Sequence, residues 1–497
     1  MPRKFLVLIL LTLALPACGQ NPARTNSTQA IEEALRAREF AQALQLAQEE
    51  LSASPRNARL WTLQGIAFSG LNKSQEALAA FDRALSISPD YLPALQGAAQ
   101  LDYESSNTQA IPRLERILRQ LPSDPTSHAM LAVLAYKRHD CATAVKHFEQ
   151  STQLISTQPA ALAEYGACLM DLNRPQDAIA EFQQIVAQSP QDPHARYDLA
   201  IAQLAAHQAG AVVETLQPLL GAGPGDPDIL DLASSAYEEL GDTPKAVELL
   251  RQAIVLNPRK TRYYLDFATL SFNHQSFQVG VDMVNVGLKE SPNSAPLYVA
   301  RGILYIQMAQ YDKGEADFQT ATRIDPAQAS GSVAQGMAQI QQSNLDAALA
   351  TVKSQLKSHP QEAFLYYLKA QILVQKGVPA GGPQFKEAIA AASRASQIQP
   401  DFALPRDILA KLYLESGQLN LAIEQCHLAL RGNPSDQEAL YHLIQALRQS
   451  GKGSKSEMAD LVKRLADLRQ ESREQEALDN KYKLYEPTEN DAGTPRQ

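Results

Sequence analysis

Residues 61–89 decide the fold, and they read WTLQGIAFSGLNKSQEALAAFDRALSISP. Large apolar side chains recur at steps of three and four residues, which is the spacing of one face of a helix. The turn Gly70-Leu-Asn-Lys73 interrupts this pattern with residues that tolerate a left-handed conformation. Pro89 closes the stretch, because proline cannot continue a helix. The segment therefore predicts two helices joined by a tight turn.

The closing proline recurs along the chain and marks a period. Most gaps between successive prolines are 34 residues, and the exceptions are 33, 68 and 40. The gap of 68 is two periods with Ser156 in place of the missing proline, and the gap of 40 contains an insertion near residues 377–382. A fixed period of this length predicts a repeat fold. The prolines are Pro55, Pro89, Pro122, Pro190, Pro224, Pro258, Pro292, Pro326, Pro360, Pro400 and Pro434.

The repeated unit resembles the tetratricopeptide repeat across residues 30–470. The family's Trp, Gly, Tyr, Ala, Phe, Ala and Pro positions are occupied here by Trp61, Gly65, Phe68, Ala77, Phe81, Ala84 and Pro89. The resemblance implies an all-α fold, a right-handed superhelix (α-solenoid) of about 12 helical hairpins with a C-terminal capping helix. In such a hairpin Gly65 and Ala77 are small because the two helices cross closely there, and Phe81 fills the space around the crossing.

The composition is that of a folded, mildly acidic protein. Of the 497 residues, 45% are hydrophobic and 20% are charged, and the formal net charge is −9. No basic stripe is visible in the sequence. Because binding to phosphates needs clustered cations, nucleic acid is not expected as a partner.

The first residues are predicted to form a lipoprotein signal. Two basic residues precede the apolar run 5–15, which is too short to cross a bilayer and has the length of a signal-peptide core. The run ends in Leu15-Pro16-Ala17-Cys18, which resembles the lipobox of bacterial lipoproteins. The resemblance implies cleavage after residue 17 and acyl chains on Cys18 that anchor the chain to a membrane. Gly19 replaces the aspartate that retains many lipoproteins at the inner membrane, which favours the periplasmic face of the outer membrane.

The resemblance also places a ligand groove on the first helix of each hairpin. Positions 4, 7, 11 and 14 residues after the preceding proline share one helix face, because the steps are three or four residues. In this chain these positions are largely apolar, which favours a groove for an extended peptide or a partner helix. The candidate binding residues are Tyr136, Met170, Tyr197, Ile201, Leu204, Phe272, Ile303, Ile306, Met337, Phe364 and Tyr367.

Two other interpretations of these positions stay open. Tight coiling would bury many of these side chains against neighbouring first helices, and Tyr and Phe rings would also stack on sugar rings. An acidic step, formed by Asp228, Asp231 and Glu238, interrupts the apolar positions. Chaperone-binding members of the family hold a C-terminal carboxylate with Lys and Asn at inward positions. Such a clamp is not expected, since no Lys stands at offset 7 and no Asn at offset 11.

Cysteine and histidine give little indication of chemistry. Cys426 takes the Phe position of its hairpin and is expected to be buried. Cys141 and Cys168 are expected at the hairpin-turn ends of adjacent units, as separate thiols by default or as a disulfide in an oxidising compartment. His139, Cys141 and His147 lack the paired spacing of a zinc site. We expect no metal, no cofactor and no enzymatic activity.

The predicted organisation has five parts. They are a signal peptide at 1–17, a flexible tether at 18–29, an N-terminal array at 30–225, a C-terminal array with its capping helix at 226–480 and a disordered tail at 481–497. The boundary at 225 follows Pro218, which is expected to kink its helix. The predicted function is a lipid-anchored scaffold that binds peptides or helices of other cell-envelope proteins in its groove. A polysaccharide-export or glycan-binding lipoprotein is the alternative.

Overall fold

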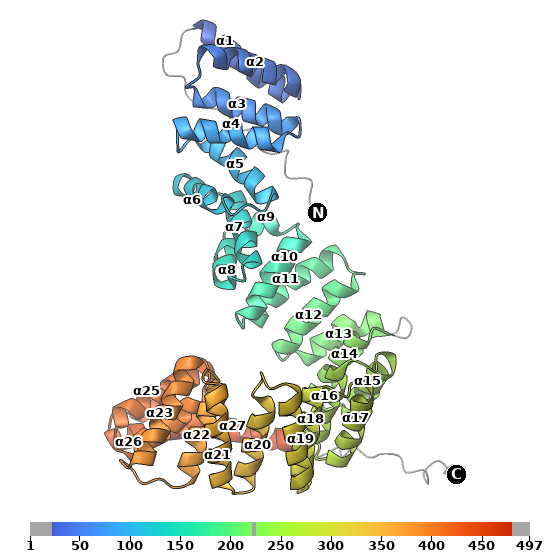
Figure 1. Ribbon diagram of the computed structural model, residues 1–497, viewed down its shortest axis with the longest axis vertical. Coiled ribbons are helices and arrows are strands. Elements are labelled where there is room, and N and C mark those ends of the chain that lie inside the picture. The colour runs from blue at the N-terminus through green and yellow to red at the C-terminus, as the bar shows by residue number, and fades with distance from the viewer. Residues whose placement is uncertain (1–21, 221–224, 480–497) are drawn as a thin grey trace, which may run out of the picture. The chain divides into compact units, whose positions relative to one another are not determined.

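The computed structural model describes residues 22–220 and 225–479. Every regular element within these residues is a helix (Figure 1). The chain divides into two compact units, Met1–Thr215 and Leu216–Gln497. The predicted all-α solenoid is therefore confirmed. The predicted signal peptide, Cys18 and the tail after residue 480 lie outside the described residues.

Unit 1 contains six helical hairpins in chain order. The second helix of the last hairpin, α13, contains the boundary between the units. Its helices are α1 Pro22–Arg36, α2 Phe40–Ala53, α3 Ala58–Gly70, α4 Ser74–Ile87, α5 Leu92–Glu104, α6 Ala110–Gln120, α7 Pro125–Lys137, α8 Cys141–Glu149, α9 Thr152–Ile155, α10 Pro159–Asp171, α11 Pro175–Gln188, α12 Pro193–Ala205 and α13 Ala209–Leu220.

Unit 2 continues the alternation and ends in a long helix. Its helices are α14 Pro227–Glu239, α15 Thr243–Leu256, α16 Thr261–Asn273, α17 Phe277–Glu290, α18 Ala295–Gln307, α19 Tyr311–Ile324, α20 Ser330–Gln341, α21 Leu345–Ser358, α22 Ala363–Gln375, α23 Pro383–Ile398, α24 Leu404–Glu415, α25 Leu419–Gly432, α26 Gln437–Ser450 and α27 Lys455–Asp479.

The periodic prolines follow the second helix of each hairpin, as the sequence predicts. Helix α4 ends at Ile87, two residues before Pro89, and the other prolines stand at the same distance from their helices, apart from Pro224, which lies outside the described residues. Helix ends leave carbonyl groups without partners. The proline carbonyl finds its donor in the side chain six residues later: Trp61 Nε1 donates to the Pro55 carbonyl and Tyr264 Oη to the Pro258 carbonyl, both at 2.9 Å. In these two repeats the residue at the family's Trp position combines a large side chain with a polar tip.

The turn inside each hairpin contains one residue in the left-handed conformation. These residues recur with the period of the repeat, and Asn72 of the predicted turn is one of them, as are Asn173, Gly241 and Gly417. The sequence could not identify the others, because side chains that disfavour a positive φ occupy the same place. They include Arg38, Ser106, His139, His207, Gln275, Ala309 and Ser343.

An aromatic ring of the second helix fills the crossing of each well-formed hairpin. A Cβ atom added to Gly65 would lie 2.6 Å from the Phe81 ring, and one added to Gly166 would lie 2.7 Å from Phe182. Gly302 stands in the same relation to Phe318. Since real carbon atoms do not approach this closely, glycine is required where the ring rests on the helix backbone. The predicted role of Gly65 is confirmed.

Curvature follows from which helices touch. In unit 2, successive first helices contact one another, in the pairs α16 with α18, α18 with α20, α20 with α22, α22 with α24 and α24 with α26. Successive second helices such as α17 and α19 make no comparable contact within the described residues. The first helices are therefore on the inside of the curve. Figure 1 shows unit 2 running in chain order from the green α14 to the orange α26.

Two predicted boundaries differ from the structure. Helix α1 begins at Pro22, so residues 22–29 are helical rather than a flexible tether. Proline suits the first position of a helix, because its fixed φ fits there and its missing N–H would have no partner. The units divide after Thr215, inside α13, rather than at residue 225. None of the helices within the described residues combines the length and apolar character needed to cross a bilayer.

The left-handed turns give a test of the backbone geometry. Ala309 is exposed and has φ 57°, a conformation in which a Cβ crowds the following carbonyl. We expect Ala309→Gly to raise the free energy of unfolding by about 1 kcal/mol, as measured by urea denaturation followed by circular dichroism. The matched change Gly241→Ala, at φ 75° with open space around it, should lower it by a similar amount. A loss of stability in Ala309→Gly would contradict this account.

Candidate functional site

The predicted groove residues of unit 1 are half-buried. Tyr136 and Met170 pack against the core formed by α7, α8, α10 and α11. Tyr197, Ile201 and Leu204 on α12 are also only partly accessible. Coiling therefore covers much of this surface in unit 1, as one of the open interpretations anticipates.

Unit 2 exposes large apolar side chains on three consecutive first helices. Phe272 on α16, Ile303 on α18 and Met337 on α20 have exposed fractions of 40%, 38% and 49%. Ile303 and Met337 occupy the same position in successive repeats, and the three helices contact one another in sequence. We call these three residues the inner stripe. Large side chains exposed in register on neighbouring helices are a feature of interaction surfaces.

Ile306 does not belong to this surface. Its exposed fraction is 4%, and it belongs to a core cluster with Phe318. A Cβ added to Gly314 would lie 2.7 Å from Cδ1 of Ile306, so the side chain fills the space between α18 and α19. The prediction that Ile306 binds a ligand is wrong, because its position 14 residues after the proline faces the hairpin partner in this repeat.

Three aromatic rings gather beyond the inner stripe. Phe364 and Tyr367 are half-buried on α22, and their ring centroids are 5.2 Å apart. Phe402, from the segment before α24, stacks on Phe364 at 5.8 Å and meets Tyr367 edge-on at 5.5 Å. Phe402 was not predicted, because it stands two residues after Pro400 and so outside the first-helix positions of the groove. The three rings support one another and form an aromatic wall.

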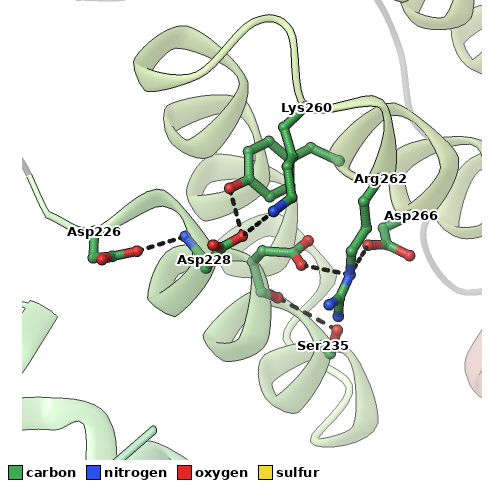
Figure 2. A network of polar contacts seen from close by, with 8 residues as sticks. Asp226, Asp228, Ser235, Lys260, Arg262 and Asp266 are labelled. Atoms are coloured by element: carbon green, nitrogen blue, oxygen red, sulfur yellow. Dashed lines mark hydrogen bonds and ion pairs between the residues drawn. The ribbon is translucent and has the colours of Figure 1, made fainter. Parts of the chain in front are cut away.

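A polar network joins α14 to α16 (Figure 2). Asp228 accepts a hydrogen bond of 2.7 Å from Tyr263 Oη and lies 3.5 Å from Lys260 Nζ. Arg262 Nε lies 3.2 Å from Asp231 and 3.3 Å from Asp266, so one guanidinium serves two carboxylates. The network fixes the first two first helices of unit 2 to each other.

Asp231 is at the centre of this network and is 2% exposed. Burial raises its pKa to about 7, the neighbouring Asp266 adds to the rise, and Arg262 opposes it. A little further along α14, Glu238 lies 2.6 Å from Nε2 of the buried His274, which follows the last residue of α16. The residues of the predicted acidic step therefore form contacts between helices. Asp231 is buried and does not face a ligand.

Cys141 and Cys168 form a disulfide, with their Cα atoms 4.9 Å apart. The default prediction of separate thiols is wrong. Cys141 begins α8 and Cys168 lies near the end of α10, so the bond joins adjacent hairpins of unit 1 at their turn ends. Cys426 is buried at the Phe position of its hairpin, as predicted.

His147, one of the three residues considered for a zinc site, contacts a histidine of another helix. His147 pairs with His128 on α7 through their Nδ1 atoms at 2.8 Å, while Nε2 of His128 lies 2.9 Å from the Pro122 carbonyl. Since that carbonyl can only accept, His128 carries its proton on Nε2, and His147 donates from Nδ1. No group of three or more metal-ligating side chains occurs within the residues that the structure describes.

This histidine pair makes unit 1 sensitive to acid. Burial lowers the pKa of His147, and His128 lowers it further, whereas Glu115 opposes the shift. The unfolded chain therefore binds a proton first as the pH falls below about 6.5, and stability present above that pH is lost. Urea midpoints of the wild-type protein should fall across this range. His147→Gln should flatten the decline, and an equally steep decline in that variant would contradict the assignment.

Family models match most of unit 1 and part of unit 2. A model described as the cytochrome c-type biogenesis protein H TPR domain matches residues 15–162. One tetratricopeptide-repeat model matches residues 169–236, and another matches 227–260 and 295–328. Tetratricopeptide repeats thus occur across the chain, and the protein belongs to the tetratricopeptide-repeat class.

Curated relatives and solved structures resemble the chain at low identity. The Hsp70-Hsp90 organizing protein 1 of Glycine max is 22% identical over 237 residues, which is 46% of this chain and 40% of that protein. Tetratricopeptide repeat protein 16 of Mus musculus is 30% identical over 76 residues, 15% of this chain and 10% of that protein. The chain thus spans well under half the length of either relative.

Two solved structures match the chain, each at low identity and with a TM-score below 0.5. The crystal structure of yeast Tom70 is 15% identical with a TM-score of 0.45, covering 92% of this chain and 95% of that one. A tetratricopeptide repeat protein from Parabacteroides merdae is 16% identical with a TM-score of 0.38, covering 58% and 98%.

Proposed function

We propose that this protein is a scaffold of the bacterial cell envelope that binds a peptide or helix of a partner protein along the first helices of unit 2. The observation that carries the proposal is the inner stripe of Phe272, Ile303 and Met337, exposed on helices that line the inside of the curve. A role in protein binding agrees with the tetratricopeptide repeats themselves.

The chemistry of the stripe favours an apolar partner segment. Side chains spaced across neighbouring helices offer separate contact points to an extended chain or to one face of a helix. The aromatic wall of Phe364, Tyr367 and Phe402 continues the apolar surface at the next first helix. Burying such side chains against a partner releases water from apolar surface, which is the main source of affinity in these interactions.

The double variant Ile303→Glu, Met337→Glu tests this surface. The two carboxylates would have to be buried at the interface, so we expect binding to weaken by more than about tenfold. Partners captured by photo-crosslinking from envelope extracts would be identified first, and their dissociation constants would then be measured. The control is Val255→Glu on α15, where the wild-type side chain is 79% exposed away from the first helices. Equal affinities for all three proteins would refute the proposal.

The envelope location is part of the same proposal. Support comes from the lipobox-like Leu15-Pro16-Ala17-Cys18 after a short apolar run. The Cys141–Cys168 disulfide also supports it, because disulfides persist in oxidising compartments such as the periplasm. Acyl chains on Cys18 would hold the scaffold at the membrane, with the outer membrane as the proposed site.

Metabolic labelling tests the anchor directly. A labelled fatty acid should enter the wild-type protein, and Cys18→Ala should abolish incorporation and release the protein from membranes, because the thioether needs that sulfur. Cys426→Ala is the control, since that thiol is buried in unit 2 and should leave labelling unchanged. Labelling that survives in Cys18→Ala would disprove the proposed anchor.

A further inference from the structure

A pocket of about 470 Å³ lies near the end of unit 2, between α24, α26 and α27. Gln437 at the start of α26 holds α27 in place, because its Nε2 donates to Ser472 Oγ at 2.7 Å and to the Leu468 carbonyl at 3.4 Å. Arg469, between those two residues, thereby becomes part of the pocket wall. The final helix does more than cap the array, since it completes a concave polar site.

The pocket wall contains two cations and two anions. Lys411 and Glu415 come from α24, Glu438 from α26 and Arg469 from α27, and all four are exposed. Within the described residues none of these four side chains forms an ion pair or a hydrogen bond. Lys411 and Glu415 stand four residues apart on one helix, which is the spacing at which such a pair forms most readily. Their charges remain available to a ligand.

Two further ionisable groups near the pocket, His442 and Asp407, are mainly uncharged at pH 7. His442 lines the pocket and is 7% exposed, and burial lowers its pKa. Its Nδ1 atom is buried without a hydrogen-bond partner among the described residues. Asp407, one turn before Lys411, has a pKa raised to about 8 by burial and by the carboxylates of Asp436 and Glu438. The wall therefore presents balanced charge, with an unsatisfied polar nitrogen beside it.

This balance restricts the chemistry of a ligand. The two glutamates repel a simple anion, and the lysine and arginine repel a simple cation. A neutral ligand would give none of these four exposed charges an opposite partner and would gain no charge–charge attraction. Only a ligand that carries both signs gives each charged group an opposite partner. Tyr441, whose ring is exposed at the pocket, adds an apolar surface for a small side chain.

We propose that this pocket binds a zwitterionic small molecule, namely a free α-amino acid or a dipeptide. Its carboxylate would lie toward Lys411 and Arg469, and its ammonium group toward Glu415 and Glu438. The volume of the pocket is within the range of ligand pockets in other proteins. The proposal is independent of partner binding, because none of its residues belongs to the inner stripe.

Isothermal titration calorimetry of the whole protein with L-alanyl-L-alanine tests the ligand class. We expect saturable binding with one site per chain. N-acetyl-L-alanine keeps only the carboxylate and L-alaninamide keeps only the ammonium group, so each should bind at least about tenfold more weakly than the dipeptide. Comparable binding of either blocked compound would overturn the proposal. So would binding of the neutral disaccharide trehalose without the dipeptide, or no dipeptide binding at millimolar concentrations.

Variants place the site. Lys411→Met and Glu438→Gln should each weaken dipeptide binding by about tenfold, because each removes one charge from an exposed position. Lys463→Met is the matched control, since it removes an exposed lysine of α27 that does not line the pocket. Unchanged binding in both pocket variants would overturn the assignment. The stripe variant Ile303→Glu, Met337→Glu should bind the dipeptide normally, so the two proposals fail separately.

Discussion

The contact between an aromatic ring and a glycine backbone fixes where the two helices cross in hairpins of both units. Phe81 rests on Gly65, Phe182 on Gly166 and Phe318 on Gly302, and no other residue leaves room for the ring. This contact brings the two helices of a hairpin close together and fixes where they cross. Because the hairpin is nearly the same each time, stacking successive copies produces a regular curve. The exposed surface on the inside of that curve is a consequence of this packing.

The two units use their inner surfaces differently. In unit 1 the first-helix side chains Tyr136 and Met170 pack on the core, and the disulfide joins neighbouring hairpins. In unit 2 the same class of positions carries three exposed apolar residues, between a polar network at α14 and α16 and a charged pocket at α24, α26 and α27. In unit 1 the first-helix side chains thus serve mainly internal packing. Unit 2 has the exposed surface on which the proposed partner binding depends.

Much of the fold could be predicted from the sequence, because period and turn chemistry are local properties. The prolines locate the end of each second helix, and Asn72 or Gly241 marks the end of a first helix. Residues such as Ala309 were missed because the fold imposes on them a conformation that their own chemistry disfavours. The position of a residue in the repeat also does not determine whether its side chain is exposed. Ile306 turns into the hairpin although Ile303, three residues earlier, does not.

The candidate sites were harder to predict than the fold, because they depend on distances between segments that are far apart in the sequence. Cys141 and Cys168 are 27 residues apart in the sequence. They become partners only because the stacking of adjacent hairpins brings the start of α8 close to the end of α10. The charged pocket needs Arg469, and its place is set by Gln437 holding α27 against α26. Neither relation leaves a motif in the sequence. The acidic step was visible, but only burial shows that Asp231 serves the contact between helices.

The disulfide also changes how the protein would respond to mechanical tension. A force that pulls along the chain passes through the sulfur bridge and bypasses the residues between Cys141 and Cys168. That loop cannot be drawn out, which removes about 90 Å from the extended contour of unit 1. Other hairpins would unravel one by one, whereas α8 and α10 would stay tied until the bond is reduced. The disulfide therefore limits how far this part of unit 1 can be extended by force.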